Sequence, residues 1–198
     1  EAECVERIRL QRDAPDLWLL FAPLKKSRTD FVVEKATELG VSTIIPVRTE
    51  LTNARRVAVR RLRLVAREAA EQCHGLAVPK IRDFTELSGL LASWPDDRTL
   101  IVCDEMLRDD ASSGPDRIHG AGGGWESIEE ISGCSDEAEA KRGLAVLVGP
   151  EGGLSQGERR SLRGLPRCVT VSLGSRLLRA ETAVAAALTL VNIRGFRR

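Results

Sequence analysis

The chain has 198 residues, a mass of 21.7 kDa and a net charge of +1, with 42% hydrophobic and 30% charged residues. This balance is typical of a folded domain and argues against a disordered or fibrous chain. No apolar run approaches the roughly 18 residues that a membrane span needs, so the sequence predicts neither a membrane span nor a membrane partner.

The cysteines and histidines argue against a metal site. Five cysteines are scattered without a C-x-x-C pair, and only two histidines are present. Structural zinc sites need clustered Cys and His ligands. We therefore expect no metal, and we interpret the cysteines as reduced thiols of a cytoplasmic protein.

Short apolar runs alternate with amphipathic stretches along the chain. In the first half they predict a strand at 17–22, a helix at 29–39 closed by Gly40, a strand at 43–47 and a helix at 56–74. The next predicted elements are a strand at 80–84, a short helix at 86–94 stopped by Pro95, and a strand at 99–103.

The second half of the chain continues the alternation. It predicts a strand at 144–148, a helix from Gln156, a strand at 169–173 and a final helix from Glu181. Continuously apolar strands between helices are typical of a mostly parallel sheet covered on both faces. The predicted fold class is therefore α/β, with helices on both faces of a mostly parallel sheet.

Two stretches fall outside this alternation. Residues 108–142 are rich in glycine, serine and acidic residues without a sustained period, so we interpret them as a flexible, solvated insertion rather than a functional loop. Residues 1–14 alternate weakly and are expected to be the remnant of a preceding domain. Residues 15–198 then form the main domain.

The segment GPEGGLSQGE, residues 149–158, directly follows one apolar strand. It lacks the Gly-Lys-Ser/Thr of a P-loop and the G-x-G-x-x-G spacing of dinucleotide binders. Ser155 and Glu158 predict a capping box, so a helix should start there. Taken alone, a tight strand-to-helix turn explains this segment as well as a ligand site does.

The residues before that cap favour a ligand. Gly149, Gly152 and Gly153 allow a ligand to approach the backbone closely, and Pro150 stiffens the turn. Glu151 is then expected beside the ligand. In open α/β sheets, ligands bind at such strand-to-helix loops.

A second loop of this kind, LGSRLLRAETA, covers residues 173–183. Leu177 and Leu178 lie between two arginines, where a loop needs exposed leucines only to line a pocket. The helix after it, AVAAALTLV, is apolar nearly all round and should be buried on several sides. Another subunit or a threaded segment of the chain would bury it.

Four segments together resemble the RsmE-type 16S ribosomal RNA uracil-N3 methyltransferases of the SPOUT superfamily. They are DFVVEKATELGVSTIIPV (30–47), REAAEQC with a following VP (67–73 and 78–79), LVGPEGGLS (147–155) and LGSRLLRAETA. The resemblance implies a C-terminal deep trefoil knot that binds S-adenosylmethionine and a homodimer through the knot region. It also implies methylation at N3 of one uridine in the 16S rRNA of the small ribosomal subunit.

The resemblance places the cofactor at the two glycine loops. The residues expected to line its site are Leu147, Gly149, Pro150, Glu151, Gly152, Gly153, Leu173, Gly174, Leu177 and Leu178. Methyl transfer needs the methyl carbon and the attacking nitrogen in line, which rigid loops can provide. Apolar side chains and free backbone groups suit an adenine ring.

Two carboxylates and one arginine are the candidate catalytic residues. Uracil N3 carries a proton at neutral pH, so a general base should accelerate the reaction by about 10²–10⁴-fold. Glu151 and Glu181 are the candidate bases because both lie in the matching loops. Arg179 is the candidate for stabilising the uracilate charge or binding a phosphate.

An arginine-rich helix is the candidate RNA surface. At 100° per residue, Arg56, Arg60, Arg63 and Arg67 fall within a stripe roughly 60° wide. Such a face is often merely solvated, but an RNA substrate favours phosphate contacts. The resemblance also places Gln72 near the substrate.

The sequence departs from the family in two respects. Family members usually open with a PUA-like β-barrel, of which residues 1–14 would be the remnant. They also commonly have an arginine shortly after the E-Q-C run, whereas residues 74–77 of this chain contain none. Two alternatives therefore stay open beside the leading interpretation. They are a SPOUT methyltransferase acting on another rRNA or tRNA site, and a non-catalytic RNA-binding knot protein.

Overall fold

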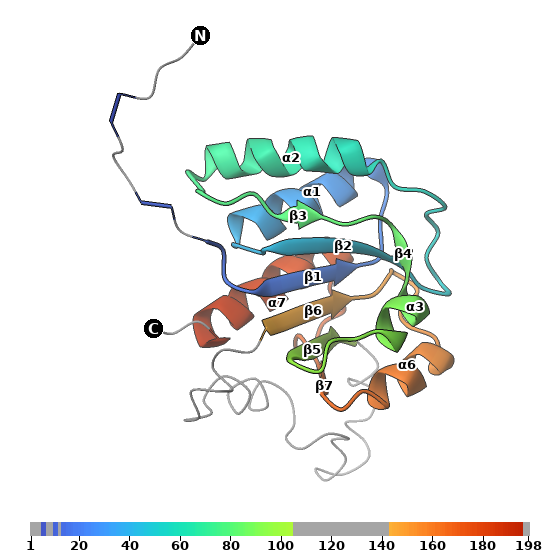
Figure 1. The fold of residues 1–198 in the computed structure, drawn as a ribbon. Coiled ribbons are helices and arrows are strands. Elements are labelled where there is room, and N and C mark those ends of the chain that lie inside the picture. Colours follow the sequence, from blue (N-terminus) through green and yellow to red (C-terminus); the bar gives the residue numbers. More distant parts are fainter. Residues whose placement is uncertain (1–4, 7–9, 12, 105–142, 196–198) are drawn as a thin grey trace.

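The computed structural model describes residues 5–6, 10–11, 13–104 and 143–195 (Figure 1). The predicted insertion at 108–142 lies outside the described residues, as do residues 1–4, 7–9 and 12 of the segment at 1–14. Within the described residues, no helix is long and apolar enough to cross a membrane.

A seven-stranded parallel sheet forms the centre of the molecule, which confirms the predicted fold class. Its strand order is β3-β2-β1-β6-β5-β7, with β4 beside β2, and every pair is parallel. The strands are β1 (Leu17–Phe21), β2 (Thr43–Arg48), β3 (Lys80–Ile81), β4 (Thr85–Glu86), β5 (Arg98–Cys103), β6 (Gly143–Val148) and β7 (Cys168–Val171).

Helices cover both faces of this sheet (Figure 1). Helices α1 (Lys26–Glu38) and α7 (Ala180–Gly195) lie on one face, with α2 (Val59–Gln72) packed against α1. Helices α3 (Leu87–Ala92) and α6 (Gln156–Arg163) lie on the other. Successive strand residues point to opposite faces, so Leu19 and Leu20 are both fully buried, one in each layer.

Several element bounds differ from the sequence prediction. Helix α1 begins at Lys26 rather than at residue 29. The predicted strand at 80–84 is shortened to β3, and β4 follows it as a separate strand that was not predicted. Strand β7 ends at Val171, so Leu173 belongs to the loop that follows it. These shifts move side chains between a regular element and the adjacent loop.

The start of α2 carries one correction. The prediction that Arg56 belongs to this helix is wrong, because α2 begins only at Val59. Ala58 has ψ of 73°, outside the helical region, and the Val59 amide donates to the Val57 carbonyl at 3.1 Å. A tight turn therefore precedes the helix, and Arg56 lies in the loop before that turn.

Among the described residues, helix α7 is covered on one face only. Its buried residues are Ala183, Val184, Ala187, Leu188 and Val191, which pack in the layer with α1. The apolar side chains of Ala185, Ala186 and Leu190 are half-buried, and Ile193 is 52% exposed. The second apolar face that the sequence predicted is thus left partly open to solvent.

Candidate functional site

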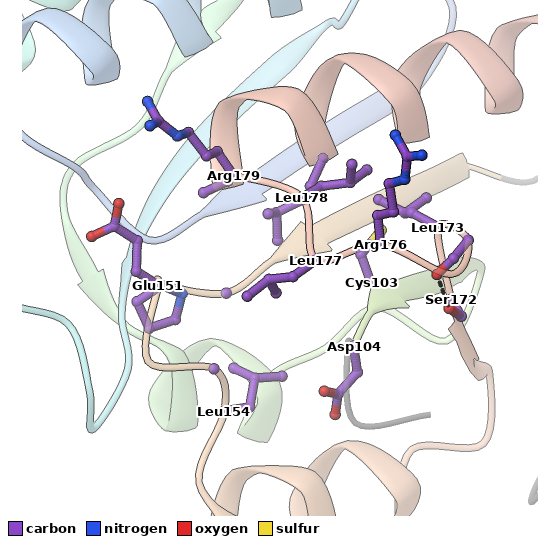
Figure 2. Close-up of a pocket in the computed structure, with 17 residues that line it drawn as sticks. Cys103, Asp104, Glu151, Leu154, Ser172, Leu173, Arg176, Leu177, Leu178 and Arg179 are labelled. Atoms are coloured by element: carbon purple, nitrogen blue, oxygen red, sulfur yellow. Dashed lines mark hydrogen bonds between the residues drawn. The ribbon is translucent and has the colours of Figure 1, made fainter. Parts of the chain in front are cut away.

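A cavity of about 310 Å³ opens at the carboxyl ends of β5, β6 and β7, which are neighbours in the sheet. Its wall is formed by the residues that directly follow these strands and by the first turn of α7 (Figure 2). Ligands of open α/β proteins bind at this edge of the sheet. The structure therefore brings the two glycine loops together around one hollow.

Most residues predicted to hold a cofactor line this cavity. They are Gly149, Pro150, Glu151, Gly153, Leu173, Gly174, Leu177 and Leu178. Two predicted residues do not line it. Leu147 is fully buried in the layer formed with α3 and α6, and a Cβ on Gly152 would lie 3.4 Å from Leu51 rather than in the cavity.

Two glycines of the cavity wall have backbone conformations that side chains disfavour. Gly153 has φ of +74° and Gly174 has φ of +111°. The Gly153 amide donates to the Pro150 carbonyl at 2.8 Å, which closes the turn around Glu151. Glycine adopts positive φ without the steric cost that a Cβ brings, so both positions shape the wall through the backbone.

The cavity has apolar walls. Leu154 is 3% exposed and Leu178 is half-buried, whereas Leu177 is 64% exposed. Figure 2 shows these leucines around the same hollow, with Glu151 and Arg179 at one end and Asp104 at another. A flat apolar ligand would cover the exposed Leu177, which is a gain of buried apolar area.

The end of β5 contributes wall residues that the sequence prediction missed. Asp104 is 8% exposed and accepts two hydrogen bonds from Arg159 of α6, from Nε to Oδ2 at 2.5 Å and from Nη2 to Oδ1 at 3.0 Å. Burial, with a further contribution from Asp104, raises the pKa of Cys103 to about 12. The thiol is therefore protonated at neutral pH and serves as a neutral wall, not as a nucleophile.

Arg28, also missed from the sequence, joins the two candidate bases. Its Nε donates to Oε1 of Glu181 at 2.9 Å, its Nη2 donates to Oε2 of Glu181 at 2.5 Å, and its Nη1 donates to Oε1 of Glu151. Bidentate pairs of this kind are among the stronger polar contacts in proteins. One guanidinium from the first turn of α1 thus ties the 149–153 loop to the start of α7.

The two carboxylates differ in how firmly they are held. Both oxygens of Glu181 are bound and its side chain is 15% exposed, and the hydrogen bonds from Arg28 lower its pKa. Glu151 contacts Arg28 through one oxygen and its side chain is 60% exposed. A carboxylate with a lowered pKa is a weak proton acceptor, so this geometry favours Glu151 as a general base.

Arg179 lines the cavity and is exposed, at the end where Glu151 lies (Figure 2). Its neighbour Arg176 lines the cavity as well. Thus two cations border a hollow that is otherwise largely apolar. In a water-poor site such cations stabilise a developing negative charge more strongly than they would in bulk water.

The predicted RNA residues lie apart from this cavity. Arg60, Arg63 and Arg67 are exposed on α2, which lies beyond α1 (Figure 1). Gln72 is exposed at the last turn of the same helix. None of them lines the cavity, so the structure does not bring them together with the other predicted site residues.

Known proteins match this chain along most of its length. Residues 12–192 match the sequence model of an RNA methyltransferase domain family. The ribosomal RNA small subunit methyltransferase E of Rickettsia conorii is 27% identical over 190 residues, which cover 96% of this chain and 69% of the relative. The Bacillus subtilis protein of the same name is 27% identical over 176 residues, which cover 85% and 62%.

Solved structures match the fold. A ribosomal RNA small subunit methyltransferase E from Neisseria gonorrhoeae bound to S-adenosyl methionine has a TM-score of 0.69 at 25% identity, covering 92% of this chain and 68% of that one. A methyltransferase from Legionella pneumophila in complex with the cofactor SAM has a TM-score of 0.72 at 25% identity, covering 93% and 69%. A tRNA-modifying enzyme of the TrmH/SpoU type from A. aeolicus, at 10% identity and a TM-score of 0.50, shares the fold alone, over 93% of this chain and 77% of that one.

Proposed function

The chain belongs to the RNA methyltransferase domain family and is of the RsmE type, and from this membership we propose that it transfers a methyl group from S-adenosylmethionine to N3 of one uridine in 16S rRNA. The observation that carries the proposal is the cavity at the ends of β5, β6 and β7, with Arg28, Glu151 and Glu181 beside it. The chain spans 69% and 62% of the two relatives named above, so the activity of a whole protein is part of the proposal.

The cavity residues suit S-adenosylmethionine. Leu154, Leu177 and Leu178 offer apolar surface for the adenine ring, and the backbone of the two loops offers hydrogen-bonding groups for its edge. The first turn of α7, where Ala180 and Ala183 line the cavity, favours a carboxylate such as that of the methionine moiety. When bound, the cofactor supplies an electrophilic methyl group on a sulfonium.

The protein's own contribution begins with the proton on uracil N3. That nitrogen becomes a nucleophile only when its N–H bond gives up the proton, and we assign Glu151 as the acceptor. One carboxylate oxygen of Glu151 is left without a contact to Arg28, and the 60% exposed side chain can pass the proton on to solvent. The electron pair of the N–H bond stays on N3, and the negative charge spreads over the uracil ring.

Arg28 and Glu181 then act as positioning residues. Glu181 holds the guanidinium through two hydrogen bonds, which leaves Nη1 directed at Glu151. Glu151 is thereby held in place through one oxygen, while its other oxygen makes no contact with Arg28. The cations Arg28 and Arg179 stabilise the charge that develops on the uracil.

The proposal includes the architecture of the family. We infer a trefoil knot in the C-terminal segment and a homodimer formed through it. The half-open apolar face of α7, with Ile193 52% exposed, supports such a dimer because a second copy would bury it. Sedimentation of the wild type and of Ile193→Lys tests this, since the charge should shift a dimer toward monomer, whereas a monomeric wild type would refute it.

Domain organisation stays a proposal of the same kind. Residues 1–14 would be the end of a preceding PUA-like barrel, and residues 108–142 would be a solvated insertion in a cytoplasmic protein. Deletion of 108–142, with both ends rejoined by a short glycine linker, should leave cofactor affinity unchanged. A loss of cofactor binding on deletion would assign that segment to the site instead.

The decisive experiment is methyl transfer to a defined RNA. The protein is incubated with labelled S-adenosylmethionine and with small ribosomal subunits, or with free 16S rRNA, from a strain that lacks this methylation. We expect label in 16S rRNA and a primer-extension stop at one uridine, because a methyl on N3 blocks base pairing. Label in tRNA, or at a position other than uridine N3, would favour another SPOUT specificity.

Cofactor titration separates the enzyme from a non-catalytic RNA-binding protein. Calorimetry should show one S-adenosylmethionine bound per chain, and Leu177→Asp should weaken binding because it places a charge in the apolar wall. RNA binding without any cofactor binding would support the non-catalytic alternative.

A further inference from the structure

A second cavity, of about 570 Å³, opens at the carboxyl ends of β1 and β2. Its lining residues follow β1 or β2 or belong to the starts of α1 and α2. They are Pro23, Leu24, Lys26, Thr29, Ala54, Arg56, Val57, Ala58 and Arg61. Because β1 is the direct neighbour of β6, both cavities lie at the same edge of the sheet, where the strand arrows end in Figure 1.

The lining of this second cavity combines apolar surface with positive charge. Pro23, Leu24 and Val57 are apolar, while Lys26 and Arg56 are exposed and form no ion pair with another described residue. No acidic residue belongs to the lining. Apolar surface beside cations suits a nucleobase together with the phosphates on either side of it.

Arg61 adds an arginine that is fixed in place. It pairs with Oδ2 of Asp30, and the other oxygen of that carboxylate, Oδ1, is buried and accepts no hydrogen bond within the described part of the chain. Orphaned buried acceptors are rare in folded proteins and are normally satisfied by water or by a ligand. Asp30 therefore has capacity for a further donor next to the wall of the second cavity.

The first turn of α1 separates the two cavities. Arg28 binds Glu151 and Glu181 beside the first cavity, while Lys26 and Thr29 line the second. Arg28 and Lys26 are two residues apart in one helical turn, which places their backbones only about 3 Å apart along the axis of α1. A nucleic-acid strand at this edge would therefore reach both cavities within neighbouring nucleotides.

We propose that the second cavity binds the nucleotide next to the methylated uridine, with its base on the apolar wall and its phosphate between Lys26 and Arg56. This rests on the proposed function, since it assumes an RNA substrate. The Thr29 hydroxyl is occupied, because it donates to the Leu24 carbonyl at 2.9 Å and accepts from the Leu24 amide at 3.0 Å. Apart from Asp30 Oδ1 next to the wall, the side chains of the lining then offer few groups for reading base edges, and we expect little selectivity among bases.

The test compares ligands of increasing length. Affinities of uridine monophosphate, a uridine dinucleotide and a pentauridylate are measured in the presence of S-adenosylmethionine, for the wild type and for the double variant Lys26→Gln with Arg56→Gln. The wild type should gain affinity from mononucleotide to dinucleotide. The double variant should lose most of that gain, about tenfold, and the slope of its log affinity against log salt should fall by roughly 0.7, the value for one lost single-strand phosphate contact.

The matched control removes two arginines from the other face of the sheet. Arg160→Gln with Arg163→Gln, both exposed on α6, should leave the length dependence unchanged. Cofactor affinity of both double variants should equal that of the wild type, which shows that they are folded.

Three results would overturn the inference. If the wild type binds pentauridylate and the Lys26/Arg56 variant binds it equally well, the second cavity is not used although the proposed function stands. If no uridine ligand binds to the cofactor-loaded wild type, the second cavity is not a nucleotide site, and methyl transfer to small ribosomal subunits decides separately whether the proposed function stands. If polyglutamate displaces pentauridylate with equal affinity per charge, the cavity is a site for acidic peptides and not for nucleotides.

Discussion

The contact between Arg28 and two glutamates gives the two candidate bases different tasks. Glu181 has both oxygens bound and a lowered pKa, whereas Glu151 is 60% exposed and bound through one oxygen. An anchored carboxylate suits positioning, and a partly free one suits proton transfer. Substitutions at these two positions should therefore have different kinetic consequences.

Glu151→Gln should lower the turnover number by about 10²–10⁴-fold, the usual contribution of a general base. Cofactor affinity should change little, since an amide keeps the shape of the side chain. The defect should narrow as the pH rises, because uridine ionised by solvent needs no base. Single-turnover rates between pH 7 and pH 10 measure this, and a defect that is constant over that range would remove Glu151 from the role.

Glu181→Gln should act on stability through its pairing with Arg28. Hydrogen bonds from Arg28 lower the pKa of Glu181 in the folded state, so the carboxylate stabilises the fold at neutral pH. That contribution is lost as the pH falls through the folded-state pKa, below the ordinary glutamate value. The variant should be less stable than the wild type by about 1–2 kcal/mol at pH 7.

Thermal unfolding at several pH values measures this difference. The gap in melting temperature between wild type and Glu181→Gln should narrow as the pH falls below the ordinary glutamate pKa of about 4.3 and close as the wild-type carboxylate takes up its proton, at a pH lowered by the hydrogen bonds from Arg28. Glu34→Gln, which removes a more exposed carboxylate paired with Lys35 on the outside of α1, is the matched control and should show a smaller gap. A gap of equal size at pH 3 and pH 7 would contradict the assigned cause.

At the scale of elements, the N-terminus of α6 holds one wall of the cavity. The Ser155 hydroxyl accepts from the Glu158 amide at 3.1 Å, and Glu158 Oε2 accepts from the Ser155 amide at 2.8 Å, which confirms the predicted capping box. Glu158 Oε1 also accepts from the Glu50 amide at 2.9 Å. The cap therefore fixes the end of the 149–153 loop and ties it to the segment after β2.

Ser155→Ala should lower the free energy of unfolding by about 1 kcal/mol, the typical cost of losing an N-cap side chain. Ser161→Ala in the same helix is the matched control, because its hydroxyl only bonds back to the Gly157 carbonyl at 3.2 Å and alanine is the better helix former. Urea denaturation of both variants measures the difference. Equal stabilities of the two variants would show that the cap adds nothing.

A comparison of predicted and observed element bounds shows which parts of the fold could be predicted from the sequence. Strands β1, β5 and β6 were predicted to within one residue because their apolar runs are buried on both faces. The start of α2 was misplaced because the residue types at 56–58 are compatible with a helix. Only the tight turn closed by the hydrogen bond from the Val59 amide to the Val57 carbonyl prevents the helix from starting earlier. Local pattern predicts burial well and predicts element ends less well.

The site residues likewise fall into those that the sequence predicted and those that it did not. The two loops were predicted because a backbone with positive φ favours glycine and a capping box requires Ser155 and Glu158 at a fixed spacing, so both can be recognised from neighbouring residues. Arg28 was not predicted as a site residue. Its partner Glu181 is 153 positions away in the sequence, and no local pattern around Arg28 indicates that contact. Asp104 was missed because its partner Arg159 is also distant in the sequence, 55 positions away. Contacts between distant segments need the packed sheet before they can be recognised.

At the scale of the whole molecule, the two cavities lie next to each other at the carboxyl edge of the sheet, and further positive charge lies on α2. The first cavity lies at the ends of β5, β6 and β7, and the second lies at the ends of β1 and β2. Helix α2, which carries exposed arginines, lies beyond α1 (Figure 1). The net charge of +1 conceals this arrangement. Local clusters and not the total charge set the affinity for a polyanion.

This arrangement predicts that RNA affinity and cofactor affinity can be changed separately. Arg60 and Arg67 are exposed on α2, and seven residues of helix separate them by about 10 Å along its axis. If each contacts one phosphate, Arg60→Gln with Arg67→Gln should reduce the slope of log affinity against log salt by roughly 1.4 for single-stranded RNA, or about 1.8 for a duplex. Cofactor affinity should not change, because neither residue lines the cavity.

The measurement is a salt titration of binding to a 16S rRNA fragment, with the Arg160/Arg163 double variant as the control for lost positive charge. Both variants lower the net charge by two, so a merely global attraction would weaken binding equally in both. A local contact changes the slope only for the α2 variant. Equal slopes in the two variants would show that the arginines of α2 are a solvated face, and RNA binding would then rest on the sheet edge alone.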